Sequence, residues 1–230
     1  MNGKKLCAVV PSAGSGRRMG GVSKPNIKLL GKTLFEYVLS ALDRSMVDES
    51  IVVCSEDNED SLRELARGFK KPVTQVRGGE SRAESVANGI NACGDADIIC
   101  VQDCARPFVT AEIIDKTIKA AEEFGAACVC APLTDTVKYK DPKTGLVSTP
   151  NRADLFAVQT PQTFKKEVYL SAINTAEGNI SGFTDETSLI ESSGGRVEYI
   201  LWSETNMKLT AIDDVPIAEI LMKKREGESK

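Results

Sequence analysis

The chain has 230 residues, of which 41% are hydrophobic and 27% charged, as expected for a globular protein with a sizeable buried core. Its net charge of -4 argues against a nucleic-acid partner, and no apolar stretch is long enough to suggest membrane association. The seven cysteines include no Cys-x-x-Cys pair, which favours reduced, buried thiols and a cytoplasmic location. The absence of histidine excludes Ser-His and Cys-His nucleophilic catalysis.

Short apolar runs alternate with segments of helical periodicity along most of the chain. The pattern predicts strands at residues 6–11, 50–54, 73–76, 97–101, 126–131, 156–160 and 196–201. It predicts helices at residues 33–44, 58–68, 83–92, 111–123, 165–174, 184–192 and 213–224, with an extended piece at 206–209. Such alternation is typical of a Rossmann-like α/β fold, here one domain over residues 1–230, with a mostly parallel sheet between two layers of helices.

Residues 133–152 interrupt this alternation. Residues 133–139 alternate like a strand, Asp-Pro-Lys-Thr-Gly at 141–145 is a strong turn signal, and residues 146–149 can return as a second strand. We therefore expect a β-hairpin arm that projects from the body. Because an isolated hairpin is marginal in water, a partner subunit is expected to cover the arm in a homodimer.

A glycine-rich segment directly follows the first predicted strand. Residues 11–19 read Pro-Ser-Ala-Gly-Ser-Gly-Arg-Arg-Met, and Lys24 follows. Small residues expose backbone N–H groups and the cations add positive charge, a combination suited to binding phosphates. The segment lacks the Lys-Ser/Thr of a Walker loop, and it lacks the third glycine and the correctly placed acidic residue of a dinucleotide fingerprint. A solvated glycine-rich turn is the simpler alternative.

Two further polar segments lie at ends of predicted strands, where ligands of parallel sheets bind. Asp103 follows the strand at 97–101, and its carboxylate could bind a hard cation or pair with Arg106. Glycines at 78–79 allow close approach of a ligand to the backbone, and Ser85 lies in the first turn of the next helix. A plain loop with a helix cap is the alternative for the second segment.

Taken in order, these segments resemble the 2-C-methyl-D-erythritol 4-phosphate cytidylyltransferases, one family of the enzymes that make CDP-linked sugar alcohols. The matching motifs are Pro-x-Ala-Gly-x-Gly-x-Arg-Met at 11–19, Gly-Gly-x-x-Arg-x-x-Ser at 78–85, Asp-x-Ala-Arg-Pro at 103–107, Asp-Thr-x-Lys at 135–138, Gln-Thr-Pro-Gln at 159–162, Thr-Asp-Glu at 184–186 and Asn-x-Lys-x-Thr at 206–210. The chain departs from the family's Pro-Lys-Gln, because it has Ser-Lys-Pro-Asn at 23–26. Counting back from Gly31 places Lys24 on the family's catalytic lysine, with Lys28 as the alternative.

The resemblance implies an enzyme that joins CTP and 2-C-methyl-D-erythritol 4-phosphate with release of pyrophosphate, in non-mevalonate isoprenoid precursor synthesis, with Mg²⁺ or another hard divalent cation as cofactor. By the family pattern, the catalytic residues are Arg18, Lys24, Arg152 and Lys208. The CTP-binding residues are Pro11, Ser12, Ala13, Gly14, Ser15, Gly16, Gly79, Glu80, Arg82 and Ser85. The acceptor-binding residues are Asp103, Arg106, Thr136, Arg152, Thr160, Thr184 and Lys208.

The resemblance also implies a metal ligand and a contribution from a neighbouring subunit. Asp103 is the expected ligand of Mg²⁺. Thr136 and Arg152 lie on or beside the arm, so they are expected to serve the site of the neighbouring subunit. The acceptor's phosphate is largely dianionic near neutral pH and needs no general base, so a chain without histidine can perform this reaction.

Three other functions compete with this interpretation. A ribitol-5-phosphate cytidylyltransferase shares the glycine-rich loop, although such enzymes tend to carry a bulkier residue than Ala105 before the arginine. An NAD-dependent oxidoreductase fits the sheet but not the loop. A non-catalytic nucleotide-binding regulator explains the loop and leaves the acceptor-side residues without a purpose.

Overall fold

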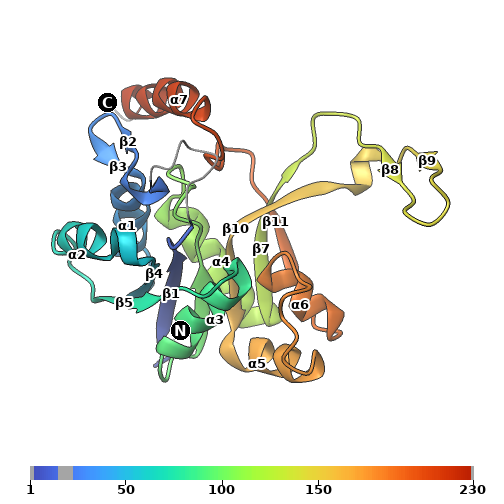
Figure 1. Cartoon of the computed structure of the whole chain (residues 1–230), viewed down its shortest axis with the longest axis horizontal. Helices are drawn as coiled ribbons and strands as arrows, with labels where there is room; N and C mark the ends of the chain where they lie inside the picture. Colours follow the sequence, from blue (N-terminus) through green and yellow to red (C-terminus); the bar gives the residue numbers. More distant parts are fainter. Residues whose placement is uncertain (1–2, 15–22, 229–230) are drawn as a thin grey trace.

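The computed structural model describes residues 3–14 and 23–228, so the predicted site residues Ser15, Gly16 and Arg18 lie outside the described residues. A seven-stranded sheet forms the centre of the body (Figure 1). Its strands in spatial order are β11 (Glu198–Leu201), β7 (Ala126–Pro132), β10 (Phe156–Lys165), β6 (Ile98–Val101), β1 (Leu6–Pro11), β4 (Glu49–Cys54) and β5 (Val73–Arg77). Only β10 runs antiparallel to its neighbours, so the predicted mostly parallel α/β fold is confirmed.

Helices cover both faces of this sheet. Strand side chains alternate between the faces, so Ala8 and Val10 enter one core while Cys7 and Val9 enter the other. The helices of the first core are α1 (Leu34–Arg44), α2 (Glu59–Ala66) and α4 (Ala111–Phe124). Those of the second are α3 (Arg82–Ala92), α5 (Lys166–Thr175) and α6 (Glu186–Ser192). Burial on both sides explains why the strands read as continuous apolar runs.

A third core joins segments from the two ends of the described chain. Helix α7 (Asp214–Glu228) buries Ala218 and Met222 against Leu29, and Leu209 joins the same cluster. Helix α7 contacts β2 (Lys28–Leu29), which forms a short hairpin with β3 (Lys32–Thr33), while the 3₁₀ turn η2 (Lys24–Asn26) packs against α1 and α2. The helix agrees with the prediction, whereas the turn and hairpin are not among the predicted elements. No helix among the described residues is long and apolar enough to cross a bilayer.

Strand β10 differs from its predicted bounds, because it continues to Lys165 instead of ending at residue 160. Its register with β7 shifts between Val158 and Gln162, and the Thr160–Pro161 peptide bond inside this irregularity is cis. Proline has no N–H to donate to a strand ladder, so it is usually confined to edges or bulges. The irregularity therefore lets the strand continue past Pro161 in the middle of the sheet.

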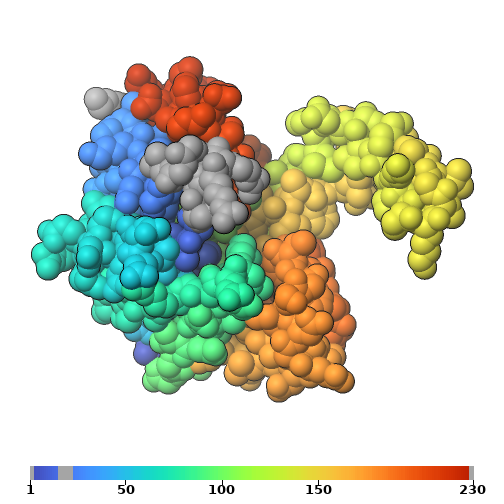
Figure 2. Space-filling view, viewed as in Figure 1, coloured from blue at the N-terminus to red at the C-terminus, as the bar shows by residue number. Residues whose placement is uncertain are grey.

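Residues 133–152 project from the body as an arm (Figures 1 and 2). The predicted turn is present, and the Asp141 carboxylate accepts the N–H groups of Lys143 (2.7 Å) and Thr144 (3.0 Å). The strands are shorter than predicted, since β8 (Tyr139–Lys140) and β9 (Val147–Ser148) pair through two residues each. A 3₁₀ turn, η4 (Arg152–Asp154), leads back to β10. Because most of its side chains are exposed, the arm has no core of its own.

Candidate active site

Three loops meet at the carboxyl edge of the parallel strands. Ser12 follows β1 and donates its N–H to the carbonyl of Val53 in β4 (2.8 Å). Gly78 follows β5 and donates to the carbonyl of Cys54 (2.9 Å), so the loop after β5 lies beside the end of β4. Asp103 follows β6, which is the other neighbour of β1. The parallel order of the sheet therefore brings the predicted segments to one edge.

Gly78 permits a close contact between two of these loops. A Cβ atom at this position would lie 2.6 Å from Cβ of Ala13 and 2.9 Å from Oγ of Ser85, so only glycine fits. The buried Ser85 hydroxyl accepts the N–H of Gly79 (3.1 Å), which holds the loop against α3. The predicted CTP-binding residues Gly79 and Glu80 are exposed, as is Gly14, while Pro11 and Ala13 are half-buried.

Asp103 is the centre of a cluster that contains four other predicted site residues. Its carboxylate lies 2.7 Å from Nζ of Lys208, 3.5 Å from the guanidinium of Arg82 and 3.7 Å from Nε of Arg106. Its backbone N–H donates to Oγ1 of Thr160 (3.0 Å). The structure thus joins residues that the sequence separates by more than one hundred positions.

The charges of this cluster are unevenly balanced. Burial alone would raise the pKa of the Asp103 carboxyl, but the cations of Lys208, Arg82 and Arg106 outweigh that effect and lower it. Asp103 is therefore ionised at neutral pH, and three cationic side chains surround its carboxylate, of which Arg82 is also paired with Glu186. Such an excess of positive charge at a sheet edge favours the binding of anions.

Glu186 is a member of the site that the predicted residues omit, although the Thr-Asp-Glu motif contains it. It is buried, and its two carboxylate oxygens accept hydrogen bonds from Arg82 at 2.9 and 3.2 Å. Burial raises the pKa of Glu186 despite this guanidinium. Burial lowers the pKa of Arg82, but the carboxylates of Glu186 and Asp103 reverse that effect and raise it above its ordinary value. Thr184 itself is exposed.

The motif around Asn206 lies between the third core and the Asp103 cluster and bonds to residues of the cluster. Arg106 donates to the carbonyl of Asn206 (2.7 Å), and the Asn206 amide donates to the carbonyl of Thr160 (2.9 Å). Within residues 3–14 and 23–228, three buried side-chain atoms lack a hydrogen-bond partner: Gln102 Oε1, Arg106 Nε and Asn206 Oδ1. All three belong to residues in or beside the Asp103 cluster. Unsatisfied buried polar atoms are rare in proteins, and their concentration here indicates a functional site.

Lys24 is connected to the cluster through the backbone of Leu209 and Ala105. Its Nζ donates to the carbonyl of Leu209 (3.3 Å), and the N–H of Leu209 donates to the carbonyl of Ala105 (2.8 Å). Lys24 therefore lies beside both the Lys208 segment and the Asp103 loop. The alternative, Lys28, is exposed on β2 opposite Thr33.

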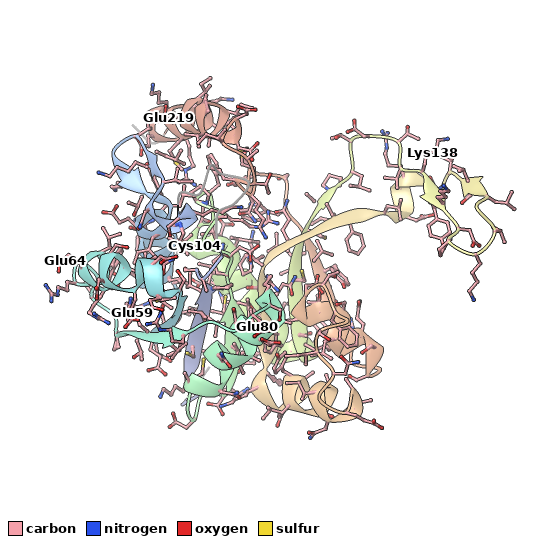
Figure 3. All side chains as sticks on the ribbon, in the orientation of Figure 1. Glu59, Glu64, Glu80, Cys104, Lys138 and Glu219 are labelled. Carbon is pink, nitrogen blue, oxygen red and sulfur yellow. The ribbon has the colours of Figure 1, made fainter. Side chains whose placement is uncertain are left out.

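The two predicted arm residues lie apart from this cluster. Thr136 and Arg152 are exposed, and Arg152 donates to the carbonyl of Thr134 at the base of the arm (2.6 Å). Figure 3 shows the same separation, with Lys138 on the arm and Cys104, the neighbour of Asp103, in the body. The chain thus does not bring Thr136 and Arg152 to its own Asp103.

Metal binding at this edge of the sheet would depend on the phosphates of a bound substrate. No group of three or more Asp, Glu, Cys or His side chains with metal-binding geometry occurs in the described part of the chain. Mg²⁺ commonly takes one or two carboxylates together with phosphate oxygens and water. Asp103 is close to three cations, so it could be the one carboxylate ligand of Mg²⁺ only if bound phosphates supplied most of the other ligands.

Comparison with known proteins identifies the family. The model of the family described as 2-C-methyl-D-erythritol 4-phosphate cytidylyltransferase matches residues 6–224. Proteins with this name from Clostridium perfringens (strain SM101 / Type A) and Alkaliphilus metalliredigens (strain QYMF) are 37% and 36% identical, covering 95% and 97% of this chain and 99% and 96% of those proteins. The crystal structure of 4-diphosphocytidyl-2C-methyl-D-erythritol synthase from Anaerococcus prevotii DSM 20548 has a TM-score of 0.85 at 27% identity, covering 96% of this chain and 100% of that one. The chain therefore belongs to the 2-C-methyl-D-erythritol 4-phosphate cytidylyltransferase family.

Proposed function

We propose that this protein transfers the cytidylyl group of CTP to 2-C-methyl-D-erythritol 4-phosphate and releases pyrophosphate, a step in isoprenoid precursor synthesis. The observation that carries the proposal is the Asp103 cluster, where Lys208, Arg82 and Arg106 lie within 3.7 Å of one carboxylate. A reaction between two polyanions needs such a concentration of cations. Family membership favours this function over a ribitol-5-phosphate cytidylyltransferase and over an NAD-dependent oxidoreductase.

The chemistry requires positioning rather than proton transfer. An oxygen of the acceptor's phosphate attacks the α-phosphorus of CTP, and the bond from this phosphorus to the bridging oxygen breaks. Pyrophosphate leaves with the electron pair of that bond. The nucleophile is already ionised, because its second pKa is about 6. The enzyme's work is to align the two anions and to stabilise the charge of the transition state.

The geometry supports a division of this work between two sides of the site. On the CTP side, Lys24 and Arg18 would hold the triphosphate, while the backbone at 12–16 and the 78–85 loop would hold phosphates, ribose and base. On the acceptor side, Arg106 and Lys208 would bind the phosphate of the alcohol, with Thr160 and Thr184 toward its hydroxyls. Mg²⁺, when bound to the triphosphate beside Asp103, would neutralise charge on the leaving pyrophosphate.

The arm supports a homodimer as part of this proposal. Tyr139, Leu146 and Val147 are 53%, 73% and 62% exposed, an unusual number of apolar side chains for a segment without a core. At the base of the arm, Leu133, Phe156 and Leu201 line a cavity of about 420 Å³. We propose that a second subunit covers these surfaces and that Thr136 and Arg152 reach the partner's acceptor site.

The state of the cysteines supports a cytoplasmic location. All seven cysteines are buried free thiols, so the fold contains no disulfide. Proteins that keep many reduced thiols are typical of reducing compartments.

The decisive experiment measures pyrophosphate release with CTP, with and without Mg²⁺. Methylerythritol 4-phosphate and ribitol 5-phosphate are compared as acceptors at equal concentration. We expect a higher kcat/KM with methylerythritol 4-phosphate and no turnover when chelator removes the metal. Preference for ribitol 5-phosphate would reassign the acceptor, and turnover that is unchanged in chelator would remove Mg²⁺ from the proposal.

A further inference from the structure

A buried asparagine connects the start of the glycine-rich segment to the residue just before Lys24. Asn58 is 1% exposed, and its side-chain amide donates to the backbone carbonyl of Ser12 (2.9 Å) and to the hydroxyl of Ser23 (3.1 Å). Its side-chain carbonyl accepts the N–H of Ser55 (3.0 Å). One carboxamide therefore contacts the segment after β1, the residue before Lys24 and the turn after β4.

The position of Asn58 in the fold explains how it reaches both segments. It is the last residue of the 3₁₀ turn η3 (Glu56–Asn58), between β4 and α2. The carboxyl end of β4 already lies beside Ser12, because Ser12 donates to the carbonyl of Val53. A second, exposed link joins Asn26 to Ser61 in the first turn of α2 (3.0 Å). The turn after β4 thus supports the Lys24 segment at two places.

We infer that Asn58 is a positioning residue of this enzyme, which holds Ser12 and Ser23 at a set separation and thereby presents Lys24 to the triphosphate. The inference rests on the proposed function. Buried polar groups with all their hydrogen bonds made restrict a structure to one arrangement. In phosphoryl transfer, a displacement of about 1 Å at a charged contact can lower the rate about a hundredfold.

Only asparagine supplies the required donors at this position. Aspartate would still accept the N–H of Ser55 through one carboxylate oxygen, so this bond within the turn η3 would remain. It has no donor for the carbonyl of Ser12, and its charge would face that carbonyl oxygen. Asn58→Asp therefore separates support of the turn from the link between Ser12 and Ser23.

The test compares Asn58→Asp, Asn58→Ala and Ser23→Ala with the wild-type full chain. We measure kcat, the KM of CTP, the KM of the alcohol phosphate and the melting temperature. Both Asn58 variants should lose about tenfold or more in kcat/KM for CTP, while the KM of the alcohol phosphate stays within about twofold. Ser23→Ala removes one of the two bonds and should lose less. Adding Ser23→Ala to Asn58→Ala should cause little further loss, because the shared bond is already gone.

The matched control is Thr117→Val, which removes a fully buried hydroxyl bonded to Thr163 (2.8 Å) between α4 and β10. It should lower the melting temperature without changing kcat or either KM. An equal loss of kcat/KM in Thr117→Val and Asn58→Asp would overturn the inference, and so would additive losses of Ser23→Ala and Asn58→Ala. A wild-type protein that does not turn over CTP would refute the proposed function instead. In that case, equal calorimetric affinity of wild type and Asn58→Asp for inorganic triphosphate would also overturn the role of Asn58.

Discussion

The Asp103 cluster and the arm differ in how far their side chains are buried and partnered within one chain. In the cluster, Asp103 and Glu186 are almost fully buried, and every charged side chain has an opposite charge within 3.7 Å. On the arm, two strands of two residues each carry exposed apolar side chains. The charges of the cluster are thus paired within one chain, whereas the apolar side chains of the arm are exposed and would pack on a second subunit in the proposed dimer. Residues placed in the cluster should act on their own subunit, and residues placed on the arm should act on its neighbour.

The largest expected effect tests whether the body carries the chemistry. In the proposed mechanism Lys24 is a preorganised charge worth about 3–4 kcal/mol in the transition state, so Lys24→Ala should lower kcat about 10²–10³-fold. The exposed Lys28→Ala is the matched control and should leave kcat unchanged. Steady-state pyrophosphate release by both variants checks this, and a loss confined to Lys28→Ala would transfer the catalytic role to Lys28.

The next effect concerns the stability of the cluster itself. Asp103→Ala should lower the free energy of unfolding by about 3 kcal/mol, because it leaves Arg106 and Lys208 without their counter-charge, while Arg82 keeps Glu186. This loss is at the low end of the range for breaking a buried ion pair. The side chains of Lys208 and Arg82 are 37% and 33% exposed, so water can partly solvate their charges when Asp103 is removed. Urea denaturation measures this, with Asp141→Ala on the arm as the control that should leave the body's stability unchanged. Equal losses in both variants would remove the contrast between the two regions.

A smaller effect on substrate affinity tests the arm. Arg152→Ala should raise the KM of the alcohol phosphate about tenfold, the cost of one charged hydrogen bond, with an unchanged melting temperature. Well below the KM of the alcohol phosphate, where Arg152→Ala retains about a tenth of wild-type activity, mixing it with Lys24→Ala should raise activity to about a quarter, because about half of the random dimers are mixed and each has one intact site. Native mass spectrometry, which separates the two homodimers and the mixed dimer by mass, confirms that mixed dimers form. Their failure to restore activity would place Arg152 in the site of its own subunit.

The smallest expected effect is on the pH dependence of the body's stability. It depends on the cysteines, all of which lie in the body and none on the arm. Burial raises the pKa of Cys100 and Cys104 to about 12, whereas a thiol of the unfolded chain ionises near pH 8.5. The unfolded state therefore loses protons first, and stability falls as the pH rises above about 8.5. Cys100→Ala should reduce this fall by about 1 kcal/mol per pH unit, as measured by urea denaturation at pH 8 to 10. An identical slope in the variant would show that Cys100 ionises in the folded state.

The sequence predicts those features that depend on local pattern. Continuous apolar runs predict the parallel strands, and the position of Asp103 after one of them predicts its place at the carboxyl edge. The prediction ends β10 too early, because Pro161 is a signal against a central strand and the irregularity that accommodates it depends on β7. The arm's strands are shorter than their alternating pattern suggests, because no sheet face exists there to bury the apolar positions.

Features that depend on distant contacts are not predictable in this way. Glu186 meets Arg82 across 104 positions, and its burial follows from the packing of α6 on the sheet. Asn58 has no distinguishing neighbours in the sequence, and its partners Ser12 and Ser23 are 46 and 35 positions away. In both cases the residue type is ordinary, and only the tertiary structure gives it a role.

The third core also links the position of Lys24 to the last part of the chain to be synthesised. Lys24 emerges early from the ribosome, yet its carbonyl partner belongs to Leu209, and Leu209 is fixed by packing with Ala218 and Met222. Domains begin to fold from their amino-terminal parts as translation proceeds. A nascent chain can therefore form the first strands of its sheet before Lys24 has this partner, and the bond from Lys24 to Leu209 is secured only after the residues up to Met222 have been translated.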